Sequence, residues 1–268
     1  MSGIPRIPNL SPEAQQVEER AILRVGQELD ALVTEYRKRF GVMVSTDSAR
    51  ELFEDYAASI ESRLQFAPAV QKAAARVADK TFAQIISERG SGMALFTAGG
   101  TGAGKTTAIR STGQTAGLLT HARIIYDSNF NSLGSSKGKV DLAIESGSTA
   151  VVIFVHRHPV ESYLDGVLPR ALEEGRTVSI GAHLRMHRDS LKTFLRVQKA
   201  FTNDPRAAFT VLNNTGHVAE AFPADISYLK GVKYDQDEIF KAIKEGLDHA
   251  YSQGKISQDL YEASCGDT

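Results

Sequence analysis

The stretch Gly99–Thr106 constrains the fold of this chain more than any other part of its sequence. It reads Gly-Gly-Thr-Gly-Ala-Gly-Lys-Thr and fits the pattern G-x-x-x-x-G-K-[ST] in full. The apolar run 93–96 predicts a short buried strand before it, and residues 107–110 can continue a helix after it. Glycines let backbone N–H groups approach phosphate oxygens closely, and a helix N-terminus adds partial positive charge. The alternative is an ordinary glycine-rich turn, but the complete motif and its flanks favour a nucleoside triphosphate site.

The motif assigns chemical roles to its last members. Lys105 would reach the β- and γ-phosphates, and the Thr106 hydroxyl would bind Mg²⁺. ATP or GTP, together with Mg²⁺, are therefore the predicted cofactors. The residues predicted to surround the nucleotide are Gly99, Gly100, Thr101, Gly102, Ala103, Gly104, Lys105, Thr106 and Thr107.

Bulk properties exclude several classes of protein. The 268 residues are 42% hydrophobic and 24% charged, with a formal net charge of −1, which is unlike a strongly basic nucleic-acid binder. No apolar run approaches about 18 residues, so we expect no membrane partner. Residues 1–10 lack the apolar core of a signal sequence, and Cys265 is the only cysteine, so no intrachain disulfide is possible. These properties predict a cytoplasmic protein without a nucleic-acid partner.

Strands alternate with helices along the chain, which predicts an α/β fold with a mainly parallel sheet flanked by helices. Predicted strands lie at 42–44, 93–98, 122–126, 150–155 and 209–212. Predicted helices lie at 12–40, 48–62, 68–88, 164–174 and 190–201, and within 235–264. Ser48 and Glu51 have the spacing of a capping box at the start of the second helix. We divide the chain into an N-terminal arm and helix (1–41), a core (42–233) and a C-terminal helical extension (234–268).

Two polar residues follow the predicted strand after the loop helix. Asp127 ends that strand, and Asn129 comes two residues later. The carboxyl ends of parallel strands line the ligand crevice of such sheets, so Asp127 can orient Mg²⁺ or contact a substrate and Asn129 can hydrogen-bond a polar substrate. The alternative is that Asp127 only caps a turn. We predict that both residues bind substrate.

A further carboxylate, Asp47, follows the short apolar run 42–44. If that run is a strand of the sheet, Asp47 lies at the crevice edge, where it can accept a proton from an acceptor hydroxyl during phosphoryl transfer. The alternative is a helix N-cap, a role that Thr46, Asp47 or Ser48 could each serve. From spacing alone, the cap is the simpler interpretation.

The segment 156–196 is rich in basic side chains. Guanidinium groups that close over a transferring phosphoryl group stabilise its negative charge, so we predict an Arg-rich lid here. The alternative is a solvated face, because acidic residues are interleaved. His183 and His187 have the i,i+4 spacing that a zinc site uses, but no third ligand is evident. The basic residues and histidines of the segment are His156, Arg157, His158, Arg170, Arg176, His183, Arg185, His187, Arg188, Lys192 and Arg196.

Together these segments resemble the zeta-toxin family of P-loop kinases over residues 42–216. Members of that family phosphorylate a sugar hydroxyl of UDP-N-acetylglucosamine and are restrained by an antitoxin. In the family, the strand with the catalytic aspartate follows the phosphate loop. Here the similar segment, residues 44–50, precedes the loop. The resemblance therefore implies a circular permutation and favours Asp47 as the general base.

The resemblance also implies roles for other residues. Asp127 and Asn129 stand in place of the Glu and Thr of the family's acceptor segment, and Arg170 and Arg176 resemble its lid arginines. Arg185 or Arg188 could replace Arg176. The implied activity is transfer of the γ-phosphate of ATP or GTP to a hydroxyl of a nucleotide-like or sugar-nucleotide acceptor. An antitoxin-like or inhibitory partner is also implied.

Two alternatives to the kinase stay open. The chain could be a nucleotide-gated binding or regulatory module that hydrolyses its nucleotide slowly. The helix predicted at 12–40 could be an attached inhibitory element or the covering helix of the core itself.

Overall fold

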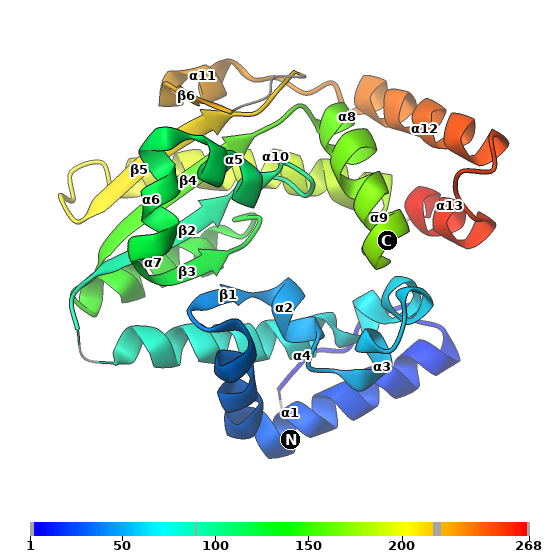
Figure 1. Cartoon of the computed structure of the whole chain (residues 1–268), viewed down its shortest axis with the longest axis horizontal. Helices are drawn as coiled ribbons and strands as arrows, with labels where there is room; N and C mark the ends of the chain where they lie inside the picture. The colour runs from blue at the N-terminus through cyan, green and yellow to red at the C-terminus, as the bar shows by residue number, and fades with distance from the viewer. Residues whose placement is uncertain (1–2, 89, 217–220, 267–268) are drawn as a thin grey trace. The chain divides into compact units, whose positions relative to one another are not determined.

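Two groups of residues make most of their contacts internally. The first unit comprises residues 1–89 with Glu173–Arg176, and the second comprises residues 90–172 and 177–268. The computed structural model describes residues 3–88, 90–216 and 221–266 (Figure 1). The division after residue 89 differs from the predicted boundary at 41/42, because residues 42–88 contain helices that pack with the N-terminal helix.

The second unit confirms the predicted α/β class with a mainly parallel sheet. Its strands run in the order β3-β2-β4-β5-β6. The pairs β2–β3, β2–β4 and β4–β5 are parallel, and β5–β6 is antiparallel. The strands are β2 (Met93–Ala98), β3 (Ala122–Asp127), β4 (Thr149–His156), β5 (Ala207–Asn213) and β6 (Phe222–Ala224).

Helices cover both sides of these strands because the central strands are apolar on both faces. In β4, residues 152–156 are all buried. Helices α5 and α6 contact the strands and lie in front of them in Figure 1, whereas α7 contacts both β4 and α10. The helices of this part of the chain are α5 (Lys105–Ser111), α6 (Gly113–His121), α7 (Leu133–Glu145), α8 (Pro159–Ser162), the π-helix η1 (Tyr163–Val167), α9 (Leu168–Glu174), α10 (Ile180–Ala200), α11 (Ile226–Gly231), α12 (Gln236–Ser252) and α13 (Gln258–Cys265).

The parallel register brings several polar residues to one edge of the sheet. Thr97 of β2 pairs with Asp127 at the end of β3, and Ala98 pairs with Phe154 of β4. His156, the last residue of β4, pairs with Asn213, the last residue of β5. The phosphate loop also leaves β2 at this edge. The predicted position of Asp127 at the carboxyl edge is therefore confirmed.

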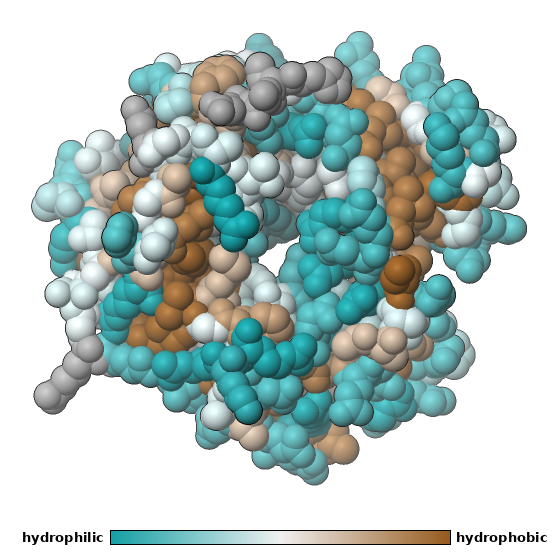
Figure 2. Space-filling model, viewed as in Figure 1, coloured by the Kyte–Doolittle hydropathy of each residue, from teal (hydrophilic) through white to brown (hydrophobic). Residues whose placement is uncertain are grey.

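The first unit is built on a long helix pair. Helix α1 (Pro12–Phe40) packs along α4 (Ile60–Ser87). The helix has the predicted bounds: the Ser11 hydroxyl accepts a hydrogen bond from the backbone N–H of Ala14, and Gly41 ends the helix with a φ of 63°. The apolar side of α1 is buried, while the residues over α1 on the face shown in Figure 2 are mostly hydrophilic.

The prediction of one helix over 48–62 is wrong. Two short helices, α2 (Thr46–Arg50) and α3 (Glu54–Ala57), and the start of α4 occupy this region, and the strand β1 (Met43–Ser45) precedes α2. The cap of α2 is Ser45, whose hydroxyl accepts from the N–H of Ser48, and Ser59 caps α4 in the same way through Ser62. By accepting a backbone N–H, the Ser59 hydroxyl starts a new helix inside the predicted one, whereas α3 has Phe53 at its N-cap and no side-chain cap.

Two other helix boundaries differ from the predictions. Helix α4 starts eight residues before Pro68, which lies inside it, and α10 starts at Ile180, ten residues before the predicted Ser190. The Ser179 hydroxyl caps α10 by accepting from Ala182 N–H. Within the part of the chain that the structure describes, no helix combines the length and apolar character needed to cross a membrane.

Replacing Tyr36 by Phe should destabilise the first unit. The Tyr36 hydroxyl is buried, accepts from the Ser45 N–H at 2.8 Å and donates to the Met43 carbonyl at 3.0 Å. Losing it leaves a buried donor and an acceptor without partners, which we expect to lower the free energy of unfolding by about 1–3 kcal/mol. Urea unfolding measures the change. Tyr251→Phe, at a tyrosine that is 42% exposed, is the control, and equal effects of the two substitutions would contradict the assignment.

Candidate functional site

The phosphate loop leaves β2 and enters α5 as the motif predicts. Gly104 precedes the helix with a φ of 73°, a left-handed conformation that favours glycine. Lys105 and Thr106 then form the first two residues of α5. The strand, loop and helix that the sequence predicts are therefore present in this order.

The loop lies directly against neighbouring backbone and side chains. A Cβ on Gly100 would come within 2.1 Å of Nε2 of His187, and one on Gly102 within 2.1 Å of the Ser162 carbonyl oxygen. A Cβ on Gly166, in the π-helix, would lie 2.5 Å from the Gly102 carbonyl oxygen. These glycines are needed because α10, α8 and η1 pack onto the loop without space for a side chain.

Lys105 contacts both residues predicted to bind substrate. Its Nζ donates to Oδ1 of Asn129 at 3.2 Å and lies 4.0 Å from Oδ1 of Asp127. Asp127 also accepts a short hydrogen bond from the Thr97 hydroxyl. The Lys105 side chain is 14% exposed and that of Asp127 is 32% exposed, so both can meet a bound ligand.

Helix α10 also contacts the loop through side chains. The Thr101 hydroxyl lies 2.9 Å from Sδ of Met186, and Nδ2 of Asn129 donates to the Thr101 hydroxyl at 3.2 Å. Nε2 of His187 lies 3.0 Å from the Thr101 carbonyl oxygen. A carbonyl only accepts, so Nε2 of His187 carries the proton.

The two histidines of α10 are buried and uncharged. His183 Nε2 donates to the Pro159 carbonyl at 2.9 Å, and the rings of His183 and His187 lie 4.4 Å apart. Burial lowers the pKa of His183 to about 4. Burial, followed by the neighbouring His183, also lowers the pKa of His187 well below its ordinary value. Because both Nε2 atoms donate to carbonyls, these nitrogens do not act as zinc ligands in this arrangement.

Asn214, which follows β5, holds the loop from a second direction. Its Nδ2 donates to the Ala103 carbonyl at 2.9 Å, and its backbone N–H donates to the His156 carbonyl at 2.7 Å. His156 is buried, and its Nε2 lies 3.0 Å from the Tyr234 hydroxyl. His156 is therefore part of the packed interior and not of an exposed lid.

The predicted base, Asp47, lies in the first turn of α2 in the first unit. Ser45 serves as the N-cap, so the interpretation of Asp47 as a cap is wrong. Its Oδ1 lies 3.2 Å from a guanidinium nitrogen of Arg50, and its side chain is half exposed. Asp47 and Lys105 belong to different units, so their proximity stays a prediction.

Arg176, the second predicted lid arginine, belongs to the first unit and is held by Glu51. Its guanidinium donates to Glu51 at 2.7 Å, and Arg63 donates to the other Glu51 oxygen at 3.1 Å. Burial would raise the pKa of Glu51, but the hydrogen bonds from Arg176 and Arg63 outweigh it and lower that pKa. Burial lowers the pKa of Arg176, but Glu51, Tyr56, Asp47 and Glu174 together outweigh burial and raise that pKa. Arg176 and Asp47 are thus close enough to interact.

The structure brings most of the predicted donor-site residues together, namely the loop, Lys105, Asp127 and Asn129. Arg170 lies half-buried in α9, and its role in a lid stays a prediction. Sequence reasoning missed His187 and Asn214. The His183/His187 spacing was visible but indicated only a metal site, and Asn214 follows a parallel strand just as Asp127 does.

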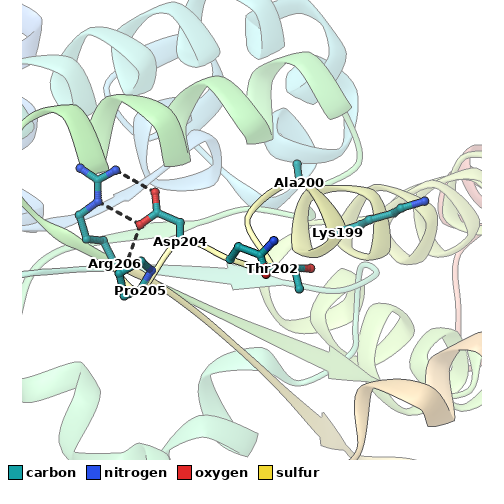
Figure 3. A pocket seen from close by; sticks show the side chains of 7 residues that line it. Lys199, Ala200, Thr202, Asp204, Pro205 and Arg206 are labelled. Atoms are coloured by element: carbon teal, nitrogen blue, oxygen red, sulfur yellow. Dashed lines mark hydrogen bonds and ion pairs between the residues drawn. The ribbon is translucent and has the colours of Figure 1, made fainter.

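A hollow of about 390 Å³ lies elsewhere in the second unit. It is lined by residues 199, 200 and 202–206, between α10 and β5, and the ion pair of Asp204 and Arg206 forms part of its wall (Figure 3). These residues precede β5, whereas Asn213 and Asn214 follow it. The hollow is therefore at the amino end of the sheet, away from the phosphate loop.

Comparisons with known proteins give little further information. No protein-family model matches the chain, and no curated protein is detectably similar to it in sequence. One similar solved structure comes from a study of the PezAT chromosomal toxin–antitoxin system of Streptococcus pneumoniae. It is 10% identical and has a TM-score of 0.42, with 88% of this chain and 82% of that chain covered. Such a likeness is too weak to assign an activity, a substrate or a partner to this chain.

Replacing Glu51 by Gln should remove a pH-dependent part of the stability. Because the folded-state pKa of Glu51 is lowered, its charge stabilises the fold above its ordinary pKa of about 4.3, and this contribution disappears as the pH falls through the folded-state value. At pH 7 we expect Glu51→Gln to lose about 1.5–3 kcal/mol of unfolding free energy.

Denaturant unfolding of both proteins from pH 7 downward measures this difference. We expect the difference between wild type and variant to shrink below about pH 4. A difference that stays constant over this range would show that the ion pairs of Glu51 with Arg63 and Arg176 do not contribute in this way. Glu54→Gln, at an exposed glutamate three residues away, is the matched control.

Proposed function

We propose that this chain is a phosphotransferase of the zeta-toxin type, which transfers the γ-phosphate of ATP or GTP to a hydroxyl of a small acceptor. The observation that carries the proposal is the complete phosphate-loop motif in a strand–loop–helix, with Lys105 beside Asp127 and Asn129 at the carboxyl edge of a parallel sheet. This is the edge at which open α/β sheets bind ligands.

The donor site fits a nucleotide with Mg²⁺. The Thr106 hydroxyl and the Asp127 carboxylate are hard oxygen donors, the type that Mg²⁺ prefers. Among the described residues, no group of three or more His, Cys, Asp or Glu side chains is arranged to hold a metal ion. This fits an ion that takes its remaining ligands from phosphates and water. Bound there, Mg²⁺ would neutralise charge on the β- and γ-phosphates.

The acceptor side of the proposal rests on the first unit. Asp47 would accept the proton of the acceptor hydroxyl. The hydroxyl oxygen would attack the γ-phosphorus, and the bond between the γ-phosphorus and the oxygen that bridges to the β-phosphate would break. Asp127 and Asn129 would position the acceptor, which we propose to be nucleotide-like or a sugar nucleotide such as UDP-N-acetylglucosamine. Arg170 and Arg176 would stabilise the transferring phosphoryl group, for which Arg176 would have to exchange Glu51 for the phosphate.

A nucleotide-gated binding or regulatory module is the second candidate. One observation favours it: the guanidinium of Arg176 is paired with Glu51 and is therefore not free to hold a phosphate. An antitoxin-like or inhibitory protein partner remains part of the proposal for either function. Such a module would show nucleotide-dependent partner binding and no phosphorylated small molecule.

Incubation of the purified protein with γ-labelled ATP and a metabolite extract distinguishes the two candidates. A kinase would give a labelled small molecule, and its mass would identify the acceptor. Release of inorganic phosphate alone would contradict the kinase and support the regulatory module.

Replacing Lys105 by Ala should abolish transfer and weaken the binding of MgATP. The lysine supplies the positive charge that meets the β- and γ-phosphates, and no other lysine lies within the motif. Titration calorimetry with MgATP, alongside the transfer assay, measures both effects. Lys241→Ala, at a lysine whose side chain is 79% exposed in α12, should leave both unchanged. Full binding by Lys105→Ala would contradict the donor site.

Replacing Asp47 by Asn should leave nucleotide binding intact and reduce turnover by about 10²-fold or more, because an amide cannot accept the hydroxyl proton. Steady-state kinetics with the identified acceptor would show the loss in kcat. Asp30→Asn, at an aspartate whose side chain is 92% exposed in the same unit, is the matched control. Unchanged turnover by Asp47→Asn would show that another group is the base.

A further inference from the structure

Two carbonyl groups of the phosphate loop accept hydrogen bonds from side chains outside the loop. Nε2 of His187, on α10, donates to the Thr101 carbonyl at 3.0 Å. Nδ2 of Asn214, after β5, donates to the Ala103 carbonyl at 2.9 Å. The two donors come from different elements, and the two carbonyls belong to alternate residues of the loop.

These contacts also fix the direction of two N–H groups. The described peptide bonds are all trans, and in a trans peptide the carbonyl and the following N–H point in opposite directions. When the Thr101 carbonyl faces His187, the N–H of Gly102 faces away from α10. In the same way, the N–H of Gly104 faces away from Asn214. Both N–H groups therefore point away from the side chains that hold the loop, and we expect phosphate to approach from that side.

We propose that His187 and Asn214 are positioning residues that hold the N–H groups of Gly102 and Gly104 in the orientation that binds phosphate. The inference rests on the proposed nucleotide binding by this loop. It adds that the affinity of the loop depends on two side chains more than 80 residues along the chain from it.

The surroundings of His187 make it a rigid donor. The residue is 3% exposed and packs at 4.4 Å against His183, whose own Nε2 is fixed by the Pro159 carbonyl. Gly100 lets its ring approach the loop backbone, because a Cβ there would collide with Nε2. The buried ring is uncharged and therefore adds no repulsion next to Lys105.

Asn214 is equally constrained. Its backbone N–H is bound to the His156 carbonyl, which fixes the start of the side chain relative to β4. A Cβ on Gly104 would lie only 2.8 Å from its Nδ2, so glycine at position 104 leaves space for this side chain. Both donors therefore meet the loop at a position where the loop has glycine.

The test compares substitutions that remove or keep each donor. His187→Leu and Asn214→Leu retain an apolar side chain of similar size but have no N–H, whereas His187→Gln keeps a donor at a similar reach. We expect each Leu variant to bind MgADP and MgATP about tenfold more weakly, and His187→Gln to remain within about threefold of wild type. Calorimetry measures the affinity, and thermal unfolding confirms that each variant is folded.

A role in packing alone predicts a different pattern. It would lower the melting temperature of His187→Leu but leave the affinity of the folded protein unchanged, and Gln would not restore what Leu loses. The amide ¹H–¹⁵N resonances of Gly102 and Gly104 give a direct readout, because their shifts on ADP addition should be reduced in the Leu variants. His249→Leu, at an exposed histidine of α12, is the matched control.

The outcomes separate the inference from the function on which it rests. Normal nucleotide affinity in both Leu variants, with wild type binding and Lys105→Ala not binding, would overturn the inference alone. If wild type itself binds neither MgADP nor MgATP, the proposed function fails and the inference fails with it. Since Asn214 lies on another element, its variant still decides the matter if His187→Leu does not fold.

Discussion

The second unit depends on the contact of the phosphate loop with α10 and with the segment after β5. A loop that offers its N–H groups to a phosphate must turn its carbonyl groups outward, and outward-facing carbonyls that are buried need donors. The Thr101 and Ala103 carbonyls obtain them from α10 and from the segment after β5. The segment between β4 and β5 thus supplies one of these donors, His187, and the residue directly after β5 supplies the other, Asn214.

The sequence predicted the parts of the site that are local in the chain. The loop, its flanking strand and helix and the position of Asp127 follow from short patterns, and all are found where they were expected. His187 could not be assigned in this way, because its partner is a backbone carbonyl 86 residues away and a carbonyl has no sequence signature. The basic segment around it was interpreted as a lid, although three of its histidines are buried.

The first unit shows a different limit of sequence reasoning. The predicted helix over 48–62 does not form as one element, because Ser45 and Ser59 cap two separate helices, α2 and α4. Because Ser45 caps α2, an N-cap role no longer accounts for Asp47. Glu51, predicted as part of a capping box, instead binds Arg63 and Arg176. Long-range ion pairs of this kind depend on the fold and not on spacing.

The close approach of His187 to Gly100 couples two distant positions in the evolution of this chain. A side chain at position 100 would overlap the imidazole ring, so it could be accepted only together with a smaller residue at position 187. The motif pattern itself permits any residue at position 100. In related sequences, therefore, glycine here should accompany histidine on the helix, and the two should change as a pair.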